Sequence, residues 1–100
     1  MKQVVVLNRA QDEILDLLLR LNEQRDGLGE ECDEALRNAY LRLAEFPESA
    51  PVSIAPPLRR LVLRHFFLGI FYAIHGERVF IHAVLDLRQD PGLIARRLRS

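Results

Sequence analysis

Apolar residues in the first part of the chain are spaced in two ways, which predict a strand and then a helix. Residues 4–7 (VVVL) form a short continuous apolar run, whose length and valine content favour a buried strand. Helical spacing then predicts a helix over residues 9–25, with an apolar stripe of Ala10, Ile14, Leu17, Leu18 and Leu21. Asn8 is expected to cap this helix, with Gln11 in the capping-box position. Leu15 and Leu19 widen this stripe, so the helix is expected to contact more than one neighbour.

The second predicted helix has the clearest pattern in the sequence. Its apolar positions follow the i, i+3, i+4, i+7 order: Cys32, Ala35, Leu36, Ala39, Tyr40, Leu43 and Ala44. Acidic residues crowd its first turn, where the helix dipole favours negative charge, and Pro47 ends it. Residues 26–29 (DGLG) separate the two helices, so the pair is predicted to form an antiparallel hairpin.

The pattern changes after the second helix. Residues 47–57 hold four of the five prolines and are expected to form an extended linker. Three β-branched or aromatic runs follow and predict an antiparallel meander: residues 61–63, 70–74 and 79–85. Gly76-Glu77 suits a hairpin turn, and Pro91-Gly92 opens a last short helix. The predicted order is β-α-α-β-β-β-α, an α+β fold in which a helical hairpin packs on a small antiparallel sheet.

Length and composition indicate one globular domain over residues 1–100. Apolar residues make up 49% of the chain, which suits a protein with a single core. The lone Cys32 cannot support a disulfide framework, and we see neither a signal peptide nor an apolar run of the ~20 residues that a membrane helix needs. A cytoplasmic location and no membrane partner are therefore expected. No spacing of Cys, His and Asp predicts a metal site, and no glycine-rich phosphate loop predicts a cofactor. The sequence also contains no nucleophile motif.

The net charge is zero, but the two halves of the chain have opposite signs. Residues 1–50 carry six basic and eleven acidic residues, whereas residues 51–100 carry eight arginines and three acidic residues. The halves either pair with each other or leave a basic surface for an anionic partner, and the pattern alone leaves both open. A neutral total disfavours strong non-specific binding to nucleic acid, because that affinity grows with the number of phosphates neutralised.

Four segments of the second half occur in an informative order. They are LRRL at residues 58–61, FFLGIFY at 66–72, VFIHAVL at 79–85 and RQDP at 88–91. On the predicted fold, this order is similar to that of plasmid-stabilisation toxins, and nearly the whole chain resembles the ParE/RelE toxin superfamily. The resemblance implies a toxin of a type II toxin–antitoxin pair. It also implies a cognate antitoxin that lays a helix or strand along a groove or an open sheet edge.

The resemblance leaves two mechanisms to compare. RelE-type members cut messenger RNA on the ribosome, and they resemble one another in an arginine three residues before a strand tyrosine and in a C-terminal tyrosine or histidine. Here Tyr72 matches the strand tyrosine, but Gly69 stands at the arginine position, and neither Tyr nor His follows Arg88. Glycine can neither move a proton nor stabilise phosphate charge. ParE-type members are implied to bind and inhibit an essential target such as DNA gyrase, which needs a surface rather than a catalytic site.

Arginines are the best candidates for a site that binds the target or the antitoxin. The candidates are Arg59, Arg60, Arg64, Arg88, Arg96 and Arg97. For Arg59, Arg60, Arg64 and Arg88, salt bridges to the acidic helices are an equally weighted alternative. Arg96 and Arg97 lie in a C-terminal turn, where they would also complement the helix dipole. If residues 59–65 form one strand, Arg60 and Arg64 share a face and Arg59 points to the other. Under the ribonuclease alternative, the catalytic candidates are Arg60, Arg64, His65 and Arg88.

Histidines and phenylalanines give weaker indications. His82 is expected to be a surface or structural histidine, because no acid–base partner is in view, and His75 is expected to be solvated beside the hairpin turn. Core positions are the first expectation for Phe66, Phe67, Phe71 and Phe80. One or two of these phenylalanines left exposed would mark a partner surface.

A ribbon-helix-helix DNA-binding protein is a third hypothesis, because residues 4–45 read strand-helix-helix. Residues 4–7 lack the alternating basic side chains that would reach base edges, and the first half of the chain is acidic. The hypothesis also leaves the second half without a role.

Overall fold

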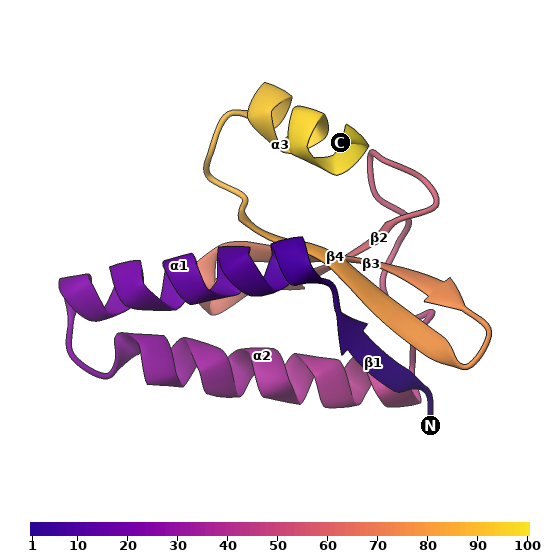
Figure 1. The fold of residues 1–100 in the computed structure, drawn as a ribbon, viewed down its shortest axis with the longest axis horizontal. Helices are drawn as coiled ribbons and strands as arrows, with labels where there is room; N and C mark the ends of the chain where they lie inside the picture. The colour runs from indigo at the N-terminus through magenta and orange to yellow at the C-terminus, as the bar shows by residue number, and fades with distance from the viewer.

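The computed structural model describes residues 1–100 and has the expected order of elements (Figure 1). The elements are β1 (Gln3–Val6), α1 (Asn8–Gln24), α2 (Leu28–Glu45), β2 (Arg59–Leu63), η1 (Arg64–Phe66), β3 (Leu68–His75), β4 (Arg78–Asp86) and α3 (Pro91–Arg99). The α+β fold class and the ParE/RelE-like order are confirmed, with the 3-10 turn η1 added between β2 and β3. No helix combines the length and the apolar character that crossing a membrane requires.

One four-stranded sheet organises the molecule, with strand order β1-β4-β3-β2. Strands β2, β3 and β4 form the predicted antiparallel meander, and Gly76 has a φ of 57° in the turn between β3 and β4. The first strand is not separate from this meander. It runs parallel to β4, with Gln3 opposite Arg78 and Val6 opposite Ile81. The sheet is therefore mixed, and residues 4–45 are not an independent ribbon-helix-helix unit.

The helical hairpin covers one face of the sheet and builds the larger core. Leu36 and Leu43 of α2 are buried together with Ile70, Tyr72 and Ile81 of the sheet. Full burial of one such aliphatic side chain contributes about 1.5–3 kcal/mol. This layer therefore supplies most of the apolar stabilisation.

The opposite face carries a smaller core beneath α3, which lies on the other side of the sheet from α2 (Figure 1). Ile94 of α3 and Leu58 pack on Phe71 and Ala73 of β3 and on Ala83 of β4. Strand β3 is thus buried on both faces over most of its length. Such burial explains why residues 70–74 are continuously apolar instead of alternating.

The cap expected for α1 is wrong, and so is the role expected of two of its leucines. The helix begins at Asn8, so Leu7 is the N-cap residue and no side chain caps the end; Gln11 Nε2 instead donates to the Val6 carbonyl oxygen at 2.9 Å. Leu15 and Leu19 are 60% and 57% exposed. They lie on the side of the helix away from the core stripe, so they do not widen it. The helix nevertheless contacts both α2 and β4, as expected.

The strand after the proline-rich linker is shorter than the seven residues considered from the sequence. Strand β2 ends at Leu63, and the chain turns through η1 before β3 begins. Arg64 therefore belongs to the turn and does not share a strand face with Arg60. Leu63 of β2 pairs with Leu68 of β3, so residues 64–67 form the tight turn between the two strands.

Candidate functional site

Arg59 is occupied by the linker that precedes it. Its Nη1 atom donates to the Ala50 carbonyl oxygen at 2.7 Å and lies 3.4 Å from the Glu48 carbonyl oxygen. On the neighbouring strand, the Tyr72 hydroxyl donates to the Pro47 carbonyl oxygen at 2.7 Å. The two side chains hold the linker against the sheet. The guanidinium of Arg59 therefore binds the linker backbone and is not free to bind a target or an antitoxin.

Arg97 joins α3 to both α1 and β4. Its Nε donates to Glu13 Oε2 at 2.6 Å, and Nη2 donates to Glu13 Oε1 at 3.0 Å and to the His82 carbonyl oxygen at 2.7 Å. Both side chains are largely buried, at 15% and 21% exposure. Of the eight arginines in the second half of the chain, Arg97 alone pairs with an acidic residue of the first half. Mutual pairing of the two halves therefore accounts for little of their opposite charge.

Arg88 is held beside the end of β4. It makes a bidentate pair with Asp86, from Nε to Oδ1 at 3.1 Å and from Nη2 to Oδ2 at 2.9 Å. This hydrogen bonding lowers the pKa of the Asp86 carboxyl below its usual value. The guanidinium also lies over the Phe67 ring, 4.8 Å from its centroid, in a cation–π contact. Arg88 is therefore exposed but fixed in place.

Three of the six predicted arginines remain open: Arg60, Arg64 and Arg96. None has a side-chain hydrogen bond or an ion pair within the chain. Arg64 is next to the turn that carries Phe67, because the Phe67 amide donates to the Arg64 carbonyl oxygen at 3.2 Å. Arg64 therefore lies in the same turn as Phe67, whereas Arg88 contacts the Phe67 ring itself. Arg60 of β2 and Arg96 of α3 share no contact with Arg64 or Arg88, so the open arginines do not form a single cluster.

The positions that match the RelE catalytic pattern are closed. A Cβ atom at Gly69 would lie 2.8 Å from Leu87 Cδ2 and 2.9 Å from Phe71 Cε2, so no side chain fits there without moving Leu87. Tyr72 is fully buried, and burial is the main cause that raises its pKa. Its hydroxyl is committed to Pro47. Neither residue is available to a bound RNA.

His75 and His82 lie on neighbouring strands and line one pocket, whereas His65 lies in η1. His65 is exposed in η1, where its ring meets the Phe66 ring edge-on at 4.8 Å, and it has no carboxylate partner. His82 is the extra residue of a β-bulge, because Phe71 pairs with Ala83 whereas Tyr72 pairs with Ile81. Burial, followed by the charges of Arg97 and His75, lowers the pKa of His82. No group of three or more His, Cys, Asp or Glu side chains is placed to hold a metal ion.

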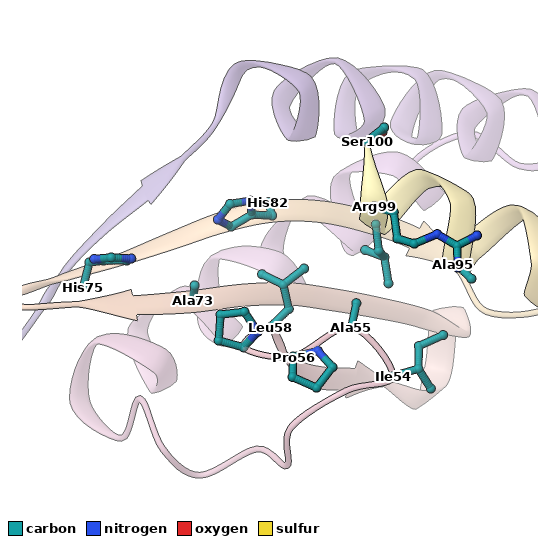
Figure 2. A pocket seen from close by; sticks show the side chains of 12 residues that line it. Ile54, Ala55, Pro56, Leu58, Ala73, His75, His82, Ala95, Arg99 and Ser100 are labelled. Atoms are coloured by element: carbon teal, nitrogen blue, oxygen red, sulfur yellow. The ribbon is translucent and has the colours of Figure 1, made fainter.

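A groove of about 700 Å³ lies between the linker, the sheet and the end of α3, and the sequence pattern did not reveal it. Its walls include Pro56, Leu58, Ala73, His82 and Ala95 (Figure 2). Figure 2 shows these side chains on the linker, on the sheet and on the end of α3. The lining combines apolar surface with imidazole groups. The one hint in the sequence was the pair of adjacent prolines in the linker, which form a rigid part of the wall.

Phe67 is the exposed aromatic among the four phenylalanines considered from the sequence. It is 52% exposed, whereas Phe71 is 1% exposed and Phe66 packs against the larger core. The expectation that one or two of them would be exposed is confirmed for Phe67. Phe46, which the sequence pattern did not single out, is 58% exposed at the end of α2.

Comparisons with known proteins give a structural likeness and no sequence relative. No protein-family model matches the chain, and no curated protein matches it in sequence. Among solved structures, the chain is similar to one described as the chromosomal ParDE TA system from P. aeruginosa. The TM-score is 0.68 at 12% identity, covering 88% of this chain and 98% of that one. At this identity the likeness concerns the fold.

Proposed function

We propose that the chain is the toxin of a type II toxin–antitoxin pair, and that it inhibits an essential target such as DNA gyrase by binding it. The observation that carries the proposal is the combination of a ParE-like fold with closed catalytic positions. Leu87 fills the space at Gly69, and Pro47 holds the Tyr72 hydroxyl. A binding toxin needs neither position, whereas a RelE-type ribonuclease needs an arginine at the first.

A cognate antitoxin is the second partner that we propose. The edge strand β2 is paired on its outer side only at its start, where the Arg60 amide donates to the Pro51 carbonyl oxygen at 3.0 Å. Beyond that point the edge is open for an added strand, and the groove of Figure 2 suits a partner helix. An acidic antitoxin would meet the unpaired guanidiniums of Arg60 and Arg96.

Induction of the chain in a bacterial host tests the proposal. We expect growth arrest with induction of the DNA-damage response, because blocked gyrase leaves broken DNA. The proposal also predicts that a short acidic protein with a DNA-binding N-terminus is encoded directly alongside, and that its co-expression restores growth. A chain that leaves growth unchanged, or an arrest that this neighbour does not relieve, would contradict the toxin–antitoxin assignment.

The ribonuclease is the alternative, favoured by one observation. Arg64 and His65 stand side by side, exposed and without partners in η1, and Arg60 is open on the preceding strand. A translation-coupled cleavage assay separates the two functions. Site-specific cuts in messenger RNA that are lost on Arg60→Ala would establish the enzyme, whereas intact messenger at concentrations that arrest growth supports the binding toxin.

A further inference from the structure

Phe67 adopts a backbone conformation that a bulky side chain rarely takes. Its φ and ψ angles are 56° and 38°, in the left-handed region, and it is the only residue other than glycine with a positive φ. The crowding between Cβ and the backbone makes this region unfavourable for phenylalanine, and glycine or asparagine would occupy it at lower cost. Local folding requirements alone therefore favour a different residue at this position.

The surrounding structure fixes this conformation from both sides. The Phe67 amide donates to the Arg64 carbonyl oxygen at 3.2 Å, and its own carbonyl oxygen accepts from the Leu87 amide at 2.8 Å. The second bond ties the turn after β2 to the segment after β4. A strained residue persists when its surroundings over-determine it in this way, and such residues cluster at functional positions.

The side chain at this position gains little from the fold. Phe67 remains 52% exposed and belongs to neither buried core cluster. Its ring contacts the guanidinium of Arg88, which lies 4.8 Å from the ring centroid and which Asp86 orients through two hydrogen bonds. The aromatic ring is therefore presented to solvent in a fixed orientation, with the unpaired Arg64 beside it in the chain.

We propose that Arg64, Phe67 and Arg88, here called the β2–β3 tip, form the surface that grips the target, and that the target is an acidic protein surface with an apolar pocket for Phe67. This inference rests on the proposed function, since it assigns the target contact of the same toxin. A few residues carry most of the binding energy in protein interfaces, and aromatic side chains and arginine are enriched among interface residues. Fixing the ring before contact also reduces the entropy lost on binding.

The charge of the tip favours a protein over a nucleic acid as the occupant. Asp86 already neutralises Arg88, so Arg64 contributes the one arginine charge without a partner at the tip. The chain as a whole has no net charge. Affinity for nucleic acid rises with the number of phosphates neutralised, and a single free guanidinium gives little of it. A pocket with an acidic rim needs only this one charge together with the ring.

Two matched phenylalanine substitutions test the tip in the growth-arrest assay. Phe67→Ser is expected to raise the amount of protein needed for arrest roughly tenfold or more, as the loss of a central anchor does. Phe46→Ser removes an equally exposed ring at the end of α2 and is expected to leave the potency unchanged. Arg64→Glu should also lower the potency, because it reverses the charge that faces the acidic rim.

A third variant separates binding from folding. Phe67→Gly relieves the left-handed strain, so its thermal midpoint should equal or exceed that of the wild type, while its potency falls as for Phe67→Ser. Full potency of a folded Phe67→Ser or Phe67→Gly protein overturns the inference and leaves the proposed function standing. Loss of potency in Phe46→Ser equal to that in Phe67→Ser also overturns it. A wild-type chain that arrests no growth overturns the proposed function and this inference together.

Discussion

At the scale of single residues, chemically identical side chains have different roles because of contacts made far along the chain. Arg96 and Arg97 are adjacent in sequence, yet Arg96 is exposed without a partner and Arg97 binds Glu13 and the His82 carbonyl oxygen. Sequence pattern grouped both as candidates for partner binding. The pairing with Glu13 depends on how α3 folds back over β4, which local spacing does not encode.

Substituting these two neighbours measures the difference. Arg97→Ala leaves Glu13 in a largely buried place without its cation, so it should lower the free energy of unfolding by roughly 1.5–3 kcal/mol. Arg96→Ala, at an exposed position, should change it by less than about 0.5 kcal/mol. Urea denaturation followed by circular dichroism provides both values. Equal effects of the two substitutions would contradict the structural role of Arg97.

Because the surroundings of His82 lower its pKa, the protein should become less stable as the pH falls. Burial and the nearby Arg97 lower the pKa of His82 below its ordinary 6.5, so the unfolded chain takes up this proton before the folded chain does. The free energy of unfolding should therefore fall as the pH drops from 7.5 through 6.5 towards 5.5. His82→Gln should flatten this dependence, whereas His65→Gln, at an exposed position, should retain it. An unchanged slope in His82→Gln would refute this account.

At the scale of elements, α3 depends on a few apolar contacts with the sheet. Ile94 is 7% exposed and packs into the smaller core, whereas its neighbour Leu93 is 50% exposed. Asp90 caps the helix by accepting a hydrogen bond from the Gly92 amide at 2.6 Å, and Pro91 occupies the first turn. The element was predicted from these turn residues, but the face that it covers was not.

Truncation of these neighbouring residues tests how α3 is attached. Ile94→Ala should lower the free energy of unfolding by about 2–4 kcal/mol, because it leaves a cavity above Phe71. Leu93→Ala should cost less than about 0.5 kcal/mol. Hydrogen exchange should show faster opening of residues 91–99 in Ile94→Ala alone. Similar losses of stability in the two variants would mean that α3 is not anchored through Ile94.

At the scale of the whole molecule, the fold class was predictable because helical and strand periods occupy separate segments of the chain. Their separation predicted the hairpin, the meander and the final helix. The parallel pairing of β1 with β4 was not predictable, since a four-residue apolar run carries no information on its neighbour. The β2–β3 tip was only partly predictable: Arg64 and Arg88 were candidates, whereas the positive φ of Phe67 and its contact with Arg88 arise from tertiary structure.

The distribution of charge along the chain was likewise not enough to predict which ion pairs form. Opposite signs in the two halves left internal pairing and partner binding equally open. The structure places a single ion pair between a second-half arginine and a first-half acid, Arg97 with Glu13. Most guanidiniums of the second half therefore remain at the surface or bind local groups.

Supercoiling of DNA by purified gyrase, measured with increasing amounts of the purified chain, tests the central claim most directly. The account predicts that wild-type protein abolishes supercoiling at concentrations near that of the enzyme, and that Phe67→Ser requires a severalfold higher concentration while Phe46→Ser does not. Supercoiling that proceeds unchanged in a large excess of wild-type protein, together with cleaved messenger RNA in a translating extract, would contradict it.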